Sequence, residues 1–202
     1  MEEKVVIEGA AVTLEGRFLP GTGGGGGAVI THPHPLFGGS MDNNVVWTAV
    51  RACQARGWAA LRFNFRGVGQ STGVYGQGLT EVEDVAAALK FLQGRTPGPH
   101  LLVGYSFGAS VAARALLQGL EAQGAILISP PVAFMEMTWL PEVPRLQLII
   151  AGDRDEIGPL IDLQAMMARV QPPVQIVVIQ GADHFYGGRE EQLFRVLRDF
   201  LP

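Results

Sequence analysis

The sequence lacks several features that mark whole classes of protein. It has one cysteine in 202 residues, so no disulfide can form within the chain. No apolar run approaches the roughly 18 residues that a membrane-spanning helix requires. The first residues, MEEKVVIEGA, do not show the basic and then apolar pattern of a secretory signal peptide. We therefore expect a soluble, cytoplasmic protein that has no membrane as a partner.

Charge is also scarce. Asp, Glu, Lys and Arg make up 17% of the residues, and the net charge of −4 offers no electrostatic reason to bind nucleic acid. Hydrophobic residues make up 48%, which indicates a folded globular chain rather than a disordered one. A length of 202 residues suits one domain with a sizeable core. We expect a single domain over residues 1–202, either as a monomer or as a homodimer.

Short apolar runs alternate with longer segments in which apolar residues recur every three or four positions. The expected strands are residues 5–9, 11–19, 27–32, 58–65, 100–105, 124–129, 146–152 and 174–180, and the expected helices are residues 44–57, 79–92, 109–119, 159–170 and 189–201. Continuous apolar strands separated by helices predict a parallel sheet that is covered on both faces. The first two runs have no helix between them, which predicts an antiparallel hairpin at one edge. The fold class is thus a doubly wound α/β domain of about eight strands.

Two serines stand in the same glycine frame, with glycine two residues before and two residues after. They are Ser106 in GYSFG and Ser71 in GQSTG. The frame alone is weak evidence, because 27 of the 202 residues are glycine. A nucleophile elbow also needs a strand before the serine and a helix after it. HLLVGY precedes Ser106 and a helical pattern follows it, whereas Ser71 lies within a glycine-rich loop, so Ser106 is the predicted nucleophile.

A serine hydroxyl becomes a good nucleophile only when a base takes its proton, and that base is commonly a histidine oriented by a carboxylate. His184, between the last expected strand and the last expected helix, is the single histidine after Ser106. Asp153, Asp155 and Glu156 follow the seventh strand and compete for the role of the carboxylate. Asp183 adjoins His184, but adjacent side chains usually diverge. The order Ser, Asp, His along the chain is the order found in α/β-hydrolases.

Five motifs in order resemble those of small bacterial α/β-hydrolases related to the dienelactone hydrolases. They are HPHPLFGGSMDN, LRFNFRGVGQSTG, GYSFGA, GDRDE and GADHFY, which together extend over nearly the whole chain. The resemblance implies an α/β-hydrolase fold and places Ser71 in a recurrent structural loop. It also implies that the acid is Asp155, about three residues beyond the glycine that ends the seventh strand. Dienelactone hydrolases use a cysteine nucleophile, whereas the only cysteine here, Cys53, lies on the apolar face of an expected helix.

An acyl-transfer site needs two backbone N–H groups directed at the developing oxyanion. Phe107, directly after Ser106, is expected to supply the first. The second should come from the loop after the third strand, where Pro33 and Pro35 have no N–H. His34, favoured by its position in the family motif, and Leu36 both remain candidates. His32 is expected to brace this loop. No further cluster of metal-binding residues is near His32 and His34 in the sequence, so no metal site is predicted. No cofactor is expected.

The connection between the sixth and seventh strands, SPPVAFMEMTWLPEVPR, is too short for a separate cap domain. Its apolar side chains, Phe134, Met137 and Trp139 among them, either line a substrate site or cover the sheet edge. Phe37 and Phe185 lie on loops that are expected to border the same cleft. These features predict a carboxylesterase whose partner is a small-molecule acyl substrate. A thioesterase or peptidase with the same residues, and a non-catalytic binding protein of the same fold, are the alternatives.

Overall fold

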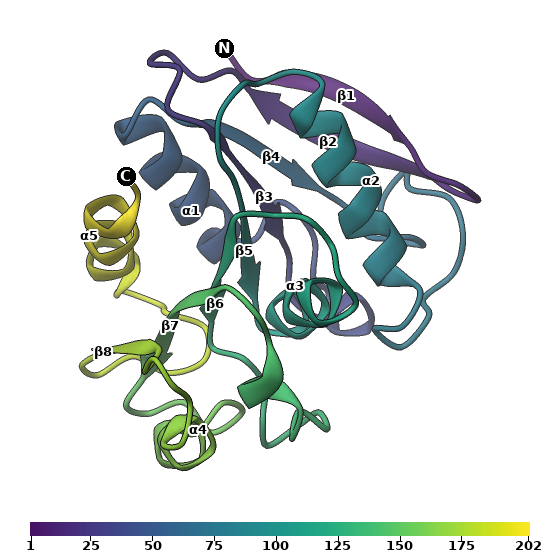
Figure 1. The fold of residues 1–202 in the computed structure, drawn as a ribbon. Helices are drawn as coiled ribbons and strands as arrows, with labels where there is room; N and C mark the ends of the chain where they lie inside the picture. Colours follow the sequence, from purple (N-terminus) through teal and green to yellow (C-terminus); the bar gives the residue numbers. More distant parts are fainter.

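An eight-stranded sheet runs through the whole protein, and helices cover both of its faces (Figure 1). The computed structural model describes residues 1–202. The strands are β1 (Glu3–Glu8), β2 (Thr13–Leu19), β3 (Gly27–Thr31), β4 (Ala59–Phe63), β5 (His100–Tyr105), β6 (Gly124–Ile128), β7 (Leu146–Gly152) and β8 (Gln175–Ile179). Their order across the sheet is β1-β2-β4-β3-β5-β6-β7-β8. The hairpin β1–β2 pairs antiparallel with β4, and all later neighbours pair in parallel.

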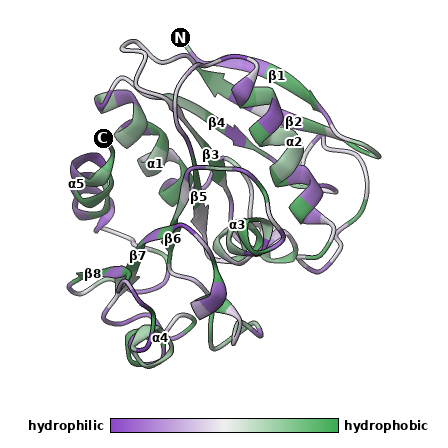
Figure 2. Ribbon diagram, viewed as in Figure 1, coloured by the Kyte–Doolittle hydropathy of each residue, from purple (hydrophilic) through white to green (hydrophobic).

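The helices divide between two hydrophobic cores, one on each face of the sheet. On one face, α1 (Asn44–Ala55) and α5 (Glu190–Phe200) pack against the strands. On the other lie α2 (Glu81–Gln93), α3 (Phe107–Leu117) and α4 (Leu160–Met167). Figure 2 shows hydrophilic and hydrophobic residues mixed along α2 and α5, whereas α3 is mostly hydrophobic. The reason is that nine of the eleven residues of α3 are buried at the centre of the molecule.

Burial explains the strand patterns in the sequence. The central strands β3, β4 and β6 are buried at every residue, so they read as continuous apolar runs. β2 alternates between buried and half-buried positions, because helices cover less of the sheet near the hairpin. The predicted doubly wound sheet of eight strands with an antiparallel edge and five helices is confirmed. None of these helices combines the length and hydrophobicity that crossing a membrane requires.

Some details differ from the prediction. β4 ends at Phe63 rather than at residue 65, because the pairing with β2 extends only one N–H further and the next N–H turns to a side chain. Asn64 N–H donates to the Glu15 carbonyl, and Phe65 N–H donates to His32 Nε2. Two short 3-10 helices were not predicted, η1 (Pro35–Phe37) and η2 (Leu140–Glu142). The connection between β6 and β7 contains only η2 and no further domain.

The loop after β4 is fastened to α2 by a buried ion pair. The Arg66 guanidinium contacts the Asp84 carboxylate at 2.7 Å, and the Asp84 side chain is inaccessible to solvent. The Arg66 backbone N–H donates to the same carboxylate at 3.0 Å. Ser71, within this loop, donates its hydroxyl to the Asn64 carbonyl at 2.7 Å and accepts the Glu15 N–H at 2.9 Å. Ser71 thus holds the loop to β2 and β4.

Candidate active site

Ser106 occupies a strained turn between β5 and α3. Its backbone has φ 54° and ψ −120°, a region that non-glycine residues rarely adopt. The turn requires a close approach of strand and helix, which the flanking glycines permit. A Cβ atom on Gly104 would lie 2.6 Å from the Ala109 Cα atom, and one on Gly108 would lie 2.5 Å from the Thr31 Oγ1 atom. Both glycines that flank Ser106 are therefore required, because a larger residue at either position would clash with neighbouring atoms.

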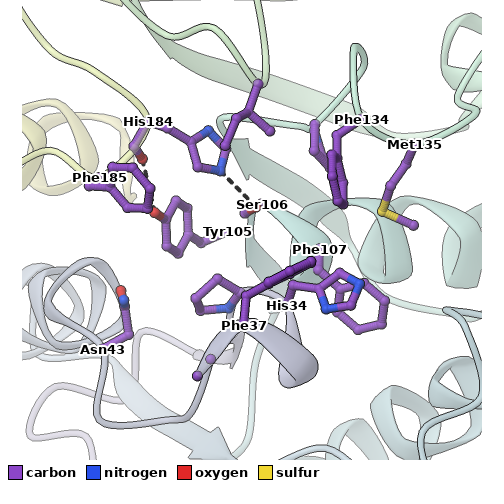
Figure 3. Close-up of a pocket in the computed structure, with 15 residues that line it drawn as sticks. His34, Phe37, Asn43, Tyr105, Ser106, Phe107, Phe134, Met135, His184 and Phe185 are labelled. Carbon is purple, nitrogen blue, oxygen red and sulfur yellow. Dashed lines mark hydrogen bonds between the residues drawn. The ribbon is translucent and has the colours of Figure 1, made fainter.

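The structure brings together the three side chains that the sequence analysis selected (Figure 3). Ser106 Oγ lies 2.8 Å from His184 Nε2. On the other side of the ring, His184 Nδ1 lies 2.9 Å from both carboxylate oxygens of Asp155. Because an ionised carboxylate only accepts hydrogen bonds, Nδ1 carries the ring hydrogen and Nε2 is left to accept the serine hydroxyl. All three residues are buried.

The loop after β7 holds the Asp155 carboxylate in position through backbone hydrogen bonds. Its Oδ1 accepts the backbone N–H groups of Ile157 and Gly158 at 2.9 and 2.8 Å. Burial acts to raise the pKa of this carboxyl, but the hydrogen bond and the electrostatic attraction of the His184 ring, with hydrogen bonds from Ser129 and Gly158, outweigh it, so the pKa of Asp155 lies below its usual value. Asp155 therefore remains an anion beside the imidazole at neutral pH.

The two competing carboxylates lie elsewhere. Asp153 is exposed and accepts the N–H of Gly181, which joins the loop after β7 to the loop after β8. Glu156 is exposed to solvent. Asp183, adjacent to the histidine, accepts the N–H groups of Phe185 and Tyr186 and so shapes its own turn.

Sequence reasoning missed the contacts that hold the histidine. The Tyr105 hydroxyl, from the last residue of β5, donates to the His184 carbonyl at 2.9 Å. Tyr186 is buried with φ 58°, and its hydroxyl lies 2.9 Å from Ser129 Oγ. Asn44, at the start of α1, donates to the Phe185 carbonyl at 3.1 Å. In the sequence, the only trace of these contacts is a tyrosine beside Ser106 and another beside Phe185. Their hydrogen-bond partners cannot be inferred until the strands are placed next to one another.

The loop after β3 carries the two candidate donors for the second oxyanion contact. The N–H of Leu36 donates to His34 Nδ1 at 3.2 Å, and Leu36 does not line the cavity beside Ser106. The His34 residue does line that cavity. Phe107 is the first residue of α3, where a backbone N–H has no acceptor within the helix. Of the two candidates, the geometry favours His34.

His32 connects this loop to β4. Its Nδ1–H donates to the Pro33 carbonyl at 2.6 Å, and its Nε2 accepts the Phe65 N–H at 3.0 Å. The side chain is fully buried, and burial lowers the pKa of His32 to about 4. The neutral ring therefore fixes the position of the loop at neutral pH. Nowhere in the chain do three or more His, Cys, Asp or Glu side chains gather as a metal site requires.

An open cavity of about 480 Å³ lies over Ser106 and His184. Three of the five side chains predicted to contact substrate line it, namely Phe37, Phe134 and Phe185. Met137 and Trp139 do not, which corrects the prediction for these two residues. Met137 is buried in the hydrophobic core, and Trp139 packs under the Arg114 guanidinium, whose carbon lies 4.7 Å from the ring centre. Both side chains therefore belong to the hydrophobic core and its cover rather than to the cavity.

Comparison with known proteins identifies the family of the chain. A family model described as serine aminopeptidase, S33 matches residues 38–152, more than half of the chain. The chain belongs to this family of α/β serine hydrolases. The α/β-hydrolase resemblance carried by its motifs is thus confirmed. The matched region contains Ser106 but ends before Asp155 and His184.

The α/β serine hydrolase has relatives that match it over nearly its full length. A Coxiella burnetii structure, described as an α/β serine hydrolase homologue, is 35% identical with a TM-score of 0.90 and covers 99% of this chain and 97% of that chain. An α/β serine hydrolase without a lid from Xanthomonas campestris is 29% identical with a TM-score of 0.90, covering 100% and 95% of the two chains. A Rickettsia prowazekii protein is 34% identical over 209 residues, which cover 98% of this chain and 88% of the relative.

Proposed function

We propose that this hydrolase is a carboxylesterase that cleaves small or medium acyl esters, with Ser106, His184 and Asp155 as its catalytic residues. The observation that carries the proposal is the continuous hydrogen-bonded path from Ser106 Oγ through the imidazole to Asp155, at the floor of an open cavity. A serine hydroxyl with such a partner loses its proton as it attacks a carbonyl, whereas an isolated hydroxyl does not.

The proposed reaction has two halves. Ser106 Oγ attacks the ester carbon as His184 Nε2 takes its proton, and the oxyanion lies between the N–H groups of Phe107 and His34. His184 then returns the proton to the alcohol oxygen as the C–O bond breaks, which leaves an acyl-serine. Water repeats the sequence and releases the acid. Asp155 keeps the ring in the productive tautomer and stabilises the imidazolium formed in each half.

The cavity walls support an uncharged substrate. None of the fifteen residues that line the cavity is Asp, Glu, Lys or Arg. An aminopeptidase would have to bind the α-ammonium group of a peptide, which is costly to desolvate without a carboxylate partner. The cavity therefore favours an ester, or a thioester of the same shape, over a free peptide N-terminus.

The first test is labelling of the purified protein with a fluorophosphonate, read by intact mass and peptide mapping. We expect one adduct on Ser106, and we expect it to be lost in Ser106→Ala and His184→Ala. Ser71→Ala is the matched control, because it removes a hydroxyl from the same glycine frame without touching the cavity. That variant loses two structural hydrogen bonds, worth roughly 1–2 kcal/mol, yet should still be labelled on Ser106.

A substrate panel then separates the reaction classes. Acyl esters, acyl thioesters and amino-acid anilides of matched acyl size are compared by kcat/KM. Preference for the esters supports the carboxylesterase, and preference for the thioesters or anilides reassigns the same residues to a thioesterase or a peptidase. A folded protein with no adduct and no turnover would instead be a binding protein of this fold.

A further inference from the structure

The cavity has two chemically different halves, one on each side of Ser106 (Figure 3). The first half is formed by His34, Phe37, Phe107, Phe134 and Met135. The second half contains Asn43, Tyr105 and Phe185, on the side of the catalytic ring of His184. An ester that reacts at Ser106 must place its acyl group in one half and its alcohol in the other.

The path of the proton decides which half takes which group, a step that rests on the proposed function. His184 must deliver its proton to the leaving oxygen, so the alcohol lies on the side of His184 and Phe185. The carbonyl carbon sits over Ser106 Oγ, and the acyl substituent is directed away from the imidazole. The half that contains Phe37 and Phe134 is therefore the acyl subsite.

The acyl subsite is built mainly from ring faces and ring edges. The Phe37 and Phe134 ring centroids lie 5.8 Å apart at an interplanar angle of 73°. The His34 ring centroid lies 4.8 Å from that of Phe37 and 5.1 Å from that of Phe107. These rings belong to three separate segments, which are the loop after β3, the start of α3 and the β6–β7 connection. Offset and edge-to-face contacts with a further ring are the arrangement that such rings favour.

The exposure of the aromatic side chains and the lack of charge in the subsite indicate more closely which acyl groups it would bind. Phe37 and Phe134 are 73% and 56% exposed, so two large apolar side chains stand at the rim of the subsite uncovered by the protein's own chain. The one titratable group among the five residues is His34, which is neutral because its Nδ1 accepts the Leu36 N–H. Its Nε2–H is directed at the Tyr75 hydroxyl at 2.9 Å. A charged acyl group would lose hydration here without gaining an opposite charge.

We propose that the acyl subsite selects uncharged aromatic acyl groups, so that the preferred substrates are arylalkanoyl esters of small alcohols. The aromatic ring would pack against the exposed sides of Phe37 and Phe134 and against His34, with the alcohol on the side of Asn43 and Phe185. Apolarity alone would not distinguish an aromatic ring from a saturated ring of similar size, whereas the ring geometry does.

The test compares methyl 3-phenylpropanoate with methyl 3-cyclohexylpropanoate, which differ in the π system and little in size. We expect kcat/KM to be about three- to tenfold higher for the phenyl ester. Phe37→Leu and Phe134→Leu should each move this ratio toward one. Phe185→Leu is the matched control, because it makes the same change in the opposite half and should leave the ratio intact. Equal kcat/KM for the two esters in the unmodified enzyme would overturn the inference.

A binding measurement separates this inference from the proposed function. Ser106→Ala is titrated with the same two esters by NMR chemical-shift perturbation, which needs no chemistry. Tighter binding of the phenyl ester, by about three- to tenfold in Kd, supports the aromatic subsite even if no ester is turned over. Equal or undetectable binding overturns it, even if esterase activity with other substrates is established.

Discussion

At the scale of single residues, Asp155 differs from its acidic neighbours in what its carboxylate contacts. It accepts two backbone N–H groups on one oxygen and faces the imidazole with both. Asp153, two residues earlier, accepts one N–H across a surface turn. Both carboxylates thus brace a loop, but only Asp155 also orients a titratable ring. The two can therefore be separated by experiment.

Asp155→Asn should lower kcat by about 10³–10⁴-fold while the protein remains folded. The amide keeps an acceptor for the N–H groups of Ile157 and Gly158, but it neither stabilises the imidazolium nor enforces the productive tautomer. Steady-state kinetics on an ester, with circular dichroism to verify the fold, is the measurement. Asp153→Asn retains its carbonyl acceptor and should change kcat less than about threefold, within the range of an ordinary surface substitution. Comparable losses in both variants would contradict the assignment.

Some site residues could be predicted from the sequence and others could not. Ser106 was separable from Ser71 because a nucleophile elbow has requirements along the chain that can be read without a structure. The choice among Asp153, Asp155 and Glu156 needed the family resemblance, since spacing does not reveal where a side chain points. Met137 and Trp139 were misplaced for a related reason. An apolar side chain in a loop packs against the nearest uncovered core, and only the fold shows where that is.

At the scale of elements, the unit of β5, the Ser106 turn and α3 is the most tightly packed part of the site. Gly104→Ala would place a Cβ atom 2.6 Å from both the Ala109 Cα atom and the Gly108 carbonyl oxygen. These are backbone atoms of a helix that is itself buried, so they cannot move aside easily. We expect a loss of about 1–3 kcal/mol in the free energy of unfolding, together with a displaced Ser106 and reduced activity.

Urea denaturation measures that loss, and Gly94→Ala provides the control. Gly94 ends α2 with an ordinary helical φ of −72°, and a Cβ atom there would approach no atom closer than 3.6 Å. That change should be neutral or slightly stabilising, because alanine lowers the entropy of the unfolded chain. A Gly104→Ala protein as stable and active as the Gly94→Ala protein would refute the packing account of the elbow.

Element positions were largely predictable because burial imposes a pattern on the sequence. The central strands are covered on both faces and the helices on one, and these two situations produce different periods of hydrophobicity. The short helices η1 and η2 escaped prediction because a single 3-10 turn is too short to show a period. The end of β4 escaped it because the ring of His32, distant in the sequence, accepts the Phe65 N–H that would have extended the strand.

At the scale of the whole molecule, the buried neutral His32 predicts an acid-sensitive fold. Its pKa of about 4 lies below the ordinary value of 6.5, so the unfolded chain binds more protons between these two values. The stabilisation is fully present above pH 6.5 and is lost as the pH falls toward 4. The loss amounts to roughly 3 kcal/mol in the free energy of unfolding. Urea melts at steps of pH would measure it.

His32→Gln serves as the comparison, since an amide oxygen also accepts a hydrogen bond but does not titrate. That variant should be less stable at pH 7 and should lose less stability between pH 6.5 and 4. The lowered pKa of Asp155 acts in the same direction, with its contribution lost at more acidic pH. Parallel pH profiles for the two proteins would show that His32 is not the source of the acid sensitivity.

The active-site residues are spread along the chain from His34 to Phe185, on loops that follow β3, β5, β6, β7 and β8. This distribution has a consequence for the order of synthesis. A nascent chain emerges from the ribosome with Ser106, the proposed nucleophile, long before His184, its proposed base, because His184 follows the last strand. The proposed nucleophile would therefore stay inert until β8 pairs with β7 and brings the imidazole to Ser106. On this proposal, hydrolysis would begin only once the last strand has joined the sheet.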